Sequence, residues 1–162
     1  MKLPFPGRTY CIDTSALIDL ADLYPKDVFP TLWTNMEQAV REGRLISPHE
    51  VLEELKAYQG SKEEPRAWAK AHTKMFIHLT DEQVGVASNI LAAHPDLVDP
   101  DKTVPDADPF VIALAKTEGA AVVTSEKPAK AGQPPKIPNV CMATQVSCLD
   151  LLEFFRAMGW AL

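Results

Sequence analysis

Four acidic residues from distant parts of the chain, Asp13, Glu54, Asp108 and Glu126, have the side chains and positions needed to bind a divalent cation. Each lies near the end of a predicted strand or near the start of a helix in an alternating strand and helix pattern. In open α/β sheets the functional crevice lies outside the carboxyl ends of the strands. We therefore expect all four carboxylates to meet at one crevice.

Few basic residues lie in these four segments, so the acids would repel one another there. At ~4 Å the repulsion is about 1 kcal/mol per pair in water and about 4 kcal/mol at an effective dielectric constant near 20. A bound divalent ion removes that cost. The pattern therefore predicts an acidic site for a divalent metal ion.

Each acid also has a simpler structural reading. Asp13 and Asp108 both precede apolar helical stretches and are ordinary N-cap residues, each worth about 1 kcal/mol. Capping and metal binding are compatible, because a helix N-terminus keeps a carboxylate ionised. Glu126 could be a solvated loop acid, and Asp106 could assist the site or only solvate its loop.

The helical stretch after the second predicted strand contains Glu50, Glu53 and Glu54. Glu50 is best explained by a capping box with Ser47, and Glu53 is expected to face solvent. Glu54 lies beside core residues, where an acid needs a partner or a metal. We therefore choose Glu54 as the site residue and keep Glu50 as an auxiliary acid.

The hydrophobic periodicity predicts strands alternating with helices, and so a parallel sheet covered on both faces. Predicted strands cover residues 9–13, 44–46, 121–124 and 140–142. Predicted helices run to about residue 23, over 28–42, from 48 to about 59, around 68, from 81 to about 93, from 108 to 118 and over about 148–158. Capping boxes are expected at Ser47 and Thr80, and a further cap at 61–64.

The chain of 162 residues is long enough for one domain over 1–162 with its own core. Its net charge of −6 argues against a general polyanion binder, although metal-binding acids contribute to that charge. Three cysteines without a C-x-x-C spacing fit reduced thiols in a cytoplasmic protein. Neither a signal peptide nor an apolar run long enough to span a membrane is apparent.

The stretch 127–139 contains four prolines, three lysines and no acidic residue, and it is expected to be a loop. Its lysines are Lys127, Lys130 and Lys136. Most basic loops are simply solvated. Beside an acidic site, however, a positive strip is suited to hold a phosphate backbone.

Taken together, these segments resemble the PIN-domain ribonucleases over nearly the whole chain. The resemblance rests on Ile12-Asp13-Thr14-Ser15, the stretch from Ser47 to Leu55, the stretch from Asp108 to Ala115, and Val122-Val123-Thr124-Ser125-Glu126. The ending Ile137-Pro138-Asn139-Val140-Cys141 before an apolar helix is similar to a PIN-like subfamily of uncharacterised bacterial and archaeal proteins. The order and spacing of these motifs are more specific than any one of them.

The resemblance implies a three-layer α/β/α sandwich in which Asp13, Glu54 and Asp108 hold Mg²⁺ or Mn²⁺, with Glu126 as a fourth acid. Thr124 would orient the site, as would Thr14 or Ser15, whose hydroxyls follow Asp13. The family usually has Asp in a Thr-x-Asp motif where this chain has Glu126. The implied activity is metal-dependent hydrolysis of RNA phosphodiester bonds with one or two ions, and the implied partners are RNA, an antitoxin protein and a second copy of the chain.

Three other functions compete with this one. A phosphatase of the haloacid dehalogenase type needs a second Asp two positions after the first, where this chain has Ser15. A receiver-type phosphoacceptor needs a supporting lysine that the sequence does not locate. A catalytically weak or inactive PIN-like scaffold that binds RNA or a partner protein remains the main alternative.

Overall fold

The structure is a computed structural model that describes residues 8–58, 60, 64–102 and 106–162. Its strands are β1 (Tyr10–Ile12), β2 (Leu45–Pro48), β3 (Phe76–Ile77), β4 (Ala121–Val123) and β5 (Cys148–Leu149). Its α-helices are α1 (Thr14–Leu23), α2 (Pro30–Arg41), α3 (His49–Ala57), α4 (Glu64–Ala71), α5 (Asp81–Ala93), α6 (Asp108–Glu118), α7 (Ile137–Thr144) and α8 (Leu151–Met158). Two short 3₁₀ helices span Thr73–Met75 and Pro95–Leu97.

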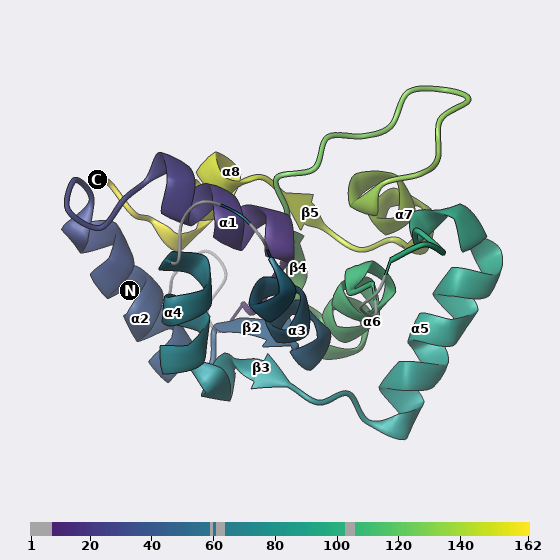
Figure 1. Cartoon of the computed structure of the whole chain (residues 1–162), viewed down its shortest axis with the longest axis horizontal. Helices are drawn as coiled ribbons and strands as arrows, with labels where there is room; N and C mark the ends of the chain where they lie inside the picture. Colours follow the sequence, from purple (N-terminus) through teal and green to yellow (C-terminus); the bar gives the residue numbers. More distant parts are fainter. Residues whose placement is uncertain (1–7, 59, 61–63, 103–105) are drawn as a thin grey trace.

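The five strands form one parallel sheet in the order β3-β2-β1-β4-β5 (Figure 1). From β1 the chain proceeds through β2 to β3 on one side, and β4 and β5 continue on the other side. The strand order therefore reverses between β1 and β4. In such sheets the reversal opens a crevice at the carboxyl ends of the two central strands.

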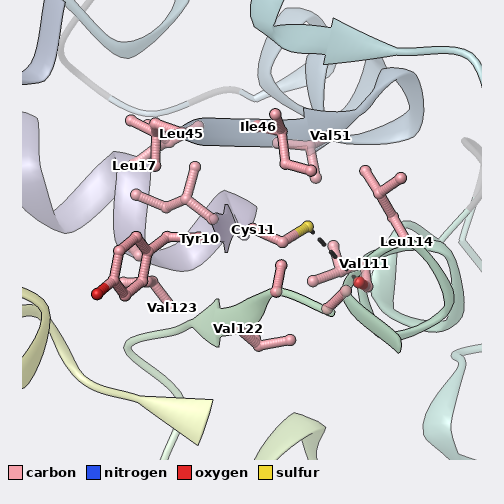
Figure 2. Packing of buried hydrophobic residues seen from close by; sticks show 14 of the residues in the cluster. Tyr10, Cys11, Leu17, Leu45, Ile46, Val51, Val111, Leu114, Val122 and Val123 are labelled. Carbon is pink, nitrogen blue, oxygen red and sulfur yellow. Dashed lines mark hydrogen bonds between the residues drawn. The ribbon is translucent and has the colours of Figure 1, made fainter. Parts of the chain in front are cut away.

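Successive side chains of β1 point to opposite faces of the sheet. Helices cover both of these faces. On one face Cys11 meets α6, where its sulfur lies 3.6 Å from the carbonyl oxygen of Val111 (Figure 2). On the other face the ring of Tyr10 packs 5.0 Å from that of Phe154 of α8. β1 is thus buried from both sides, and the predicted α/β class with a central parallel sheet is confirmed.

Trp33 of α2 and Trp68 of α4 pack edge to face at 5.8 Å, and both are buried. These two aromatic residues therefore belong to the core.

The capping box at the start of α5 forms as predicted, because the Thr80 hydroxyl accepts from the Gln83 amide and the Gln83 side chain accepts from the Thr80 amide. The predicted end of α6 is also confirmed, with Gly119 in a left-handed conformation.

The predicted strand at 140–142 is wrong, because these residues lie inside helix α7. An apolar run of three residues cannot distinguish a strand from a buried helix face, and Val140 and Cys141 are such a face. Pro138 also lies in the first turn, where helices tolerate proline. The last strand is β5, and the helix expected from about 148 begins at Leu151.

The predicted capping box at Ser47 is also wrong. Ser47 belongs to β2, and its hydroxyl donates to the carbonyl oxygen of Ile12 at 2.8 Å, while Pro48 takes the N-cap position of α3.

The short strand β3 was not predicted. The cap expected at 61–64 falls largely on residues outside the described part of the chain. No helix in the described residues is long and apolar enough to cross a membrane.

Candidate functional site

Asp13 connects the central strand β1 to helix α1 at the crevice between β1 and β4. Its backbone amide donates to the carbonyl oxygen of Val123, and its carboxylate accepts from the amide of Ala16, which makes it the N-cap of α1. Its side chain also accepts from the hydroxyls of Ser15 at 2.9 Å and Thr124 at 2.5 Å. Two strands and a helix therefore fix this carboxylate in one orientation.

The environment of Asp13 makes its ionised form costly. The residue is only 3% exposed, and this burial raises its pKa from 3.8 to about 7. The hydrogen bonds from Thr124, Ala16 and Ser15 act to lower the pKa, and repulsion by Glu126 acts to raise it. Burial outweighs the hydrogen bonds, so a bound cation would favour the ionised form.

Glu54 reaches the same crevice from α3, the helix that follows β2. Glu54 is only 8% exposed, and both of its carboxylate oxygens have partners. Oε1 accepts from the Thr14 hydroxyl at 2.5 Å, and Oε2 pairs with the ammonium of Lys102. The choice of Glu54 over Glu53 agrees with the structure, because the Glu53 side chain is 41% exposed and pairs with His49 and Lys56.

Asp108 is the first residue of α6, and Ala107 rather than Asp108 takes the N-cap position. The carboxylate of Asp106 accepts a hydrogen bond from the amide of Asp108 at 3.1 Å. Asp106 thus satisfies one of the backbone amides that have no partner within the first turn of the helix. Burial, followed by repulsion from Asp106, Glu126, Asp13 and Glu54, raises the pKa of Asp108 to about 9. The Asp108 carboxylate is therefore repelled by four other carboxylates, of which Asp106 acts most strongly.

Glu126 follows β4 and reaches toward α7. Its Oε2 accepts from the amide of Ile137, the first residue of α7, at 2.9 Å. Its own amide donates to the Thr124 hydroxyl at 3.1 Å. The longer side chain of Glu therefore bridges the end of β4 and the N-terminus of α7.

The predicted acids share one cleft of about 440 Å³ at the carboxyl edge of the sheet. The residues that line it are Asp13, Thr14, Ser15, Ile18, Glu54, Ala57, Tyr58, Lys102, Asp108 and Glu126. All four acids and both hydroxyl residues after β1 thus meet there, as the sequence predicts. Thr124 lies behind the cleft and contacts Asp13 from β4.

The possible metal ligands in this cleft are carboxylate and hydroxyl oxygens. Oxygen ligands suit Mg²⁺ or Mn²⁺ better than metals that prefer sulfur. Within the described residues, however, no group of three or more acid, histidine or cysteine side chains is already gathered tightly enough to hold an ion. Glu54 is engaged with Lys102, and Glu126 is engaged with α7. Two of the four acids are therefore already held by other groups.

The remaining predicted residues lie outside the cleft. Glu50 does not line it, and its buried Oε1 atom has no hydrogen-bond partner. Lys127 lines a neighbouring cavity with Glu126, and Lys130 and Lys136 line a third cavity beside Asp106. None of the three lysines therefore lines the acidic cleft itself.

Lys102 is the functional candidate that the sequence analysis missed. Its ammonium contacts Glu54 and lies 3.7 Å from Asp106, and its side chain is 38% exposed. Burial acts to lower the pKa of Lys102, but the hydrogen bond and attraction of Glu54 raise it overall. The available signal was a single lysine among four aspartates over residues 95–106.

The family described as a domain of unknown function (DUF4411) matches residues 10–162. Among solved structures, PAE2754 from Pyrobaculum aerophilum is 17% identical with a TM-score of 0.53, and the alignment covers 94% of this chain and 98% of that one. VapBC2 from Rickettsia felis, solved bound to a DNA fragment from its promoter, is 11% identical with a TM-score of 0.52. That alignment covers 88% of this chain and 98% of the other. No curated protein matches the chain. At these identities the likeness shows the fold alone, a central parallel sheet flanked by helices.

Proposed function

We propose that this chain, which belongs to the DUF4411 family of unknown function, is a divalent-metal-dependent ribonuclease. The observation that supports the proposal most is the convergence of Asp13, Glu54, Asp108 and Glu126 on one cleft from four separate segments. Burial, with repulsion from the neighbouring acids, raises the pKa of Asp13 and Asp108, so their ionised forms cost stability unless a cation binds them. The likeness to PIN-like structures supports the same conclusion.

Asp13 and Asp108 are the proposed direct ligands, because they are the two acids whose ionised forms are least favourable without a cation. A bound Mg²⁺ or Mn²⁺ supplies positive charge for the phosphate oxygens and lowers the pKa of water. Ser15 and Thr124 fix the orientation of the Asp13 carboxylate. Thr14 orients Glu54, which is either a ligand or the acceptor of the proton from the attacking water.

Glu126 is proposed to act from further out, because one of its oxygens is already bound to the N-terminus of α7. Its second oxygen is available for a water in the cleft. Lys127 lines a cavity with Glu126, and Lys130 and Lys136 line a cavity with Asp106; these three lysines are proposed to hold the RNA backbone. An antitoxin partner and a homodimer, both implied by the resemblance, remain predictions.

A non-catalytic scaffold that binds RNA or a protein is the second candidate. One observation favours it: among the described residues, no three acid, histidine or cysteine side chains lie close enough together to bind a metal ion. A scaffold should gain no thermal stability from Mn²⁺, whereas a nuclease should be stabilised by the ion it binds. The melting temperature with and without Mn²⁺ therefore separates the two candidates.

The test of the nuclease proposal is cleavage of a panel of labelled structured and single-stranded RNAs with Mn²⁺, with Mg²⁺ and with EDTA. We expect metal-dependent cleavage by the wild type and none by Asp13→Asn. Asp27→Asn makes the same chemical change at an exposed position and should remain active. Cleavage by Asp13→Asn equal to that of the wild type would reject the assignment of the site.

A further inference from the structure

Lys102 brings a positive charge into the acidic cleft from a loop that is otherwise acidic. It is the only lysine between residues 95 and 106, a stretch that also contains Asp96, Asp99, Asp101 and Asp106. Its ammonium contacts Glu54, whose side chain is only 7% exposed. A buried carboxylate needs such a partner, and here the chain itself provides it.

The acids in and beside the cleft differ in whether Lys102 contacts them. On one side Glu54 and Asp106 share the Lys102 ammonium, and both carboxylates are largely buried. On the other side Asp13 and Asp108 form no ion pair with any described Lys, Arg or His. Lys102 also attracts Asp108, but only across a longer distance than the ion pairs with Glu54 and Asp106.

Both oxygens of Glu54 are occupied in this arrangement. Thr14 donates to Oε1 and Lys102 donates to Oε2, so a cation next to Glu54 would have to compete with the ammonium. An ammonium and a divalent ion placed at the same carboxylate would also repel each other. The contact with Glu54 therefore disfavours a divalent ion on that side.

We propose that Lys102 is a resident cation that takes the place of a second divalent ion, so that the cleft binds a single Mg²⁺ or Mn²⁺ on the side of Asp13 and Asp108. This inference rests on the metal-dependent function proposed above and specifies how many ions that function uses. Lys102 is then a positioning residue for Glu54. Its charge holds the carboxylate in place at the border of the metal site.

The experiment is a Mn²⁺ titration of the purified full chain, with free Mn²⁺ followed by electron paramagnetic resonance and the heat of binding by calorimetry. Lys102→Met removes the charge and keeps most of the side-chain length, and Lys102→Gln is a second neutral variant in case the first does not fold. Lys56→Met is the matched control, because Lys56 pairs with Glu53 on the same helix but at an exposed position. None of these readouts depends on an RNA substrate.

We expect one Mn²⁺ per chain for the wild type and for Lys56→Met, and two for each neutral variant of Lys102. Two close ions would also couple magnetically and change the resonance spectrum of the bound Mn²⁺. Two ions in the wild type, or one ion in both neutral variants, would overturn the role of Lys102 while leaving the metal-dependent function intact. No binding by any variant, including the wild type, would reject the metal-dependent function itself and this inference with it.

Discussion

Replacing Asp13 by Asn should make the metal-free protein more stable at alkaline pH, even though it removes a proposed ligand. The Asp13 carboxylate is 3% exposed, and burial raises its pKa from 3.8 to about 7. Between these pH values the folded chain holds a proton that the unfolded chain has released. Unfolding therefore releases a proton, and raising the pH favours unfolding.

The size of the effect follows from this difference in pKa. At 1.36 kcal/mol per pH unit, ionisation of Asp13 costs the folded state up to about 4 kcal/mol at pH 8, but only about 1 to 2 kcal/mol at pH 5. The stabilising contribution of the protonated form is complete below pH 3.8 and is lost as the pH rises to about 7. Asn resembles the protonated carboxyl at every pH, so the variant avoids this loss.

The assay is urea denaturation in EDTA at pH 5 and pH 8, for the wild type, Asp13→Asn and the exposed control Asp27→Asn. We expect the gain in unfolding free energy from Asp13→Asn to be larger at pH 8 than at pH 5, and close to zero for the control. Saturating Mn²⁺ should then stabilise the wild type and not the variant. If Asp13→Asn is less stable than the wild type at pH 8 in EDTA, the cost assigned to this buried charge is wrong.

Two further predictions concern the residues that hold the acids in place. Thr124→Val keeps the shape of the side chain but removes the hydroxyl that donates to Asp13, and it should lower the unfolding free energy at pH 8 by about 1 to 3 kcal/mol. Thr34→Val, at an exposed hydroxyl of α2, is its control in the same urea titration, and equal effects of the two changes would contradict the prediction. Glu126→Asp shortens the side chain that accepts from the Ile137 amide, and it should destabilise α7 by about 0.5 to 1 kcal/mol. Faster hydrogen exchange of the Ile137 amide is the expected readout, and unchanged exchange would rule out this contact as a support of α7.

The sequence was informative where a local rule fixes a position in space. Asp13 follows a buried central strand, and the carboxyl ends of parallel strands meet at one edge, so its place in the cleft could be predicted. Glu54 could be chosen over Glu53 because it is flanked by core residues of its amphipathic helix, where an acid needs a partner. The convergence of the four acids follows from the same two rules.

Other features depend on contacts that no local pattern encodes. Lys102 reaches Glu54 across 48 positions in the sequence, and only the path of the connecting loop brings them together. The contact between Glu126 and Ile137 likewise depends on α7, which a short apolar run after several prolines suggested to be a strand. β3 has only two residues, too few for a period of two to be recognised.

The most direct test of the proposed function is the initial rate of RNA cleavage as Mn²⁺ is titrated, for the wild type and Asp108→Asn prepared in parallel. The expected result is a rate that rises with Mn²⁺ and saturates in the wild type, and no cleavage above background by Asp108→Asn or in EDTA. Cleavage that persists in EDTA, or that Asp108→Asn supports at the wild-type rate, would contradict a metal-dependent nuclease site in this cleft.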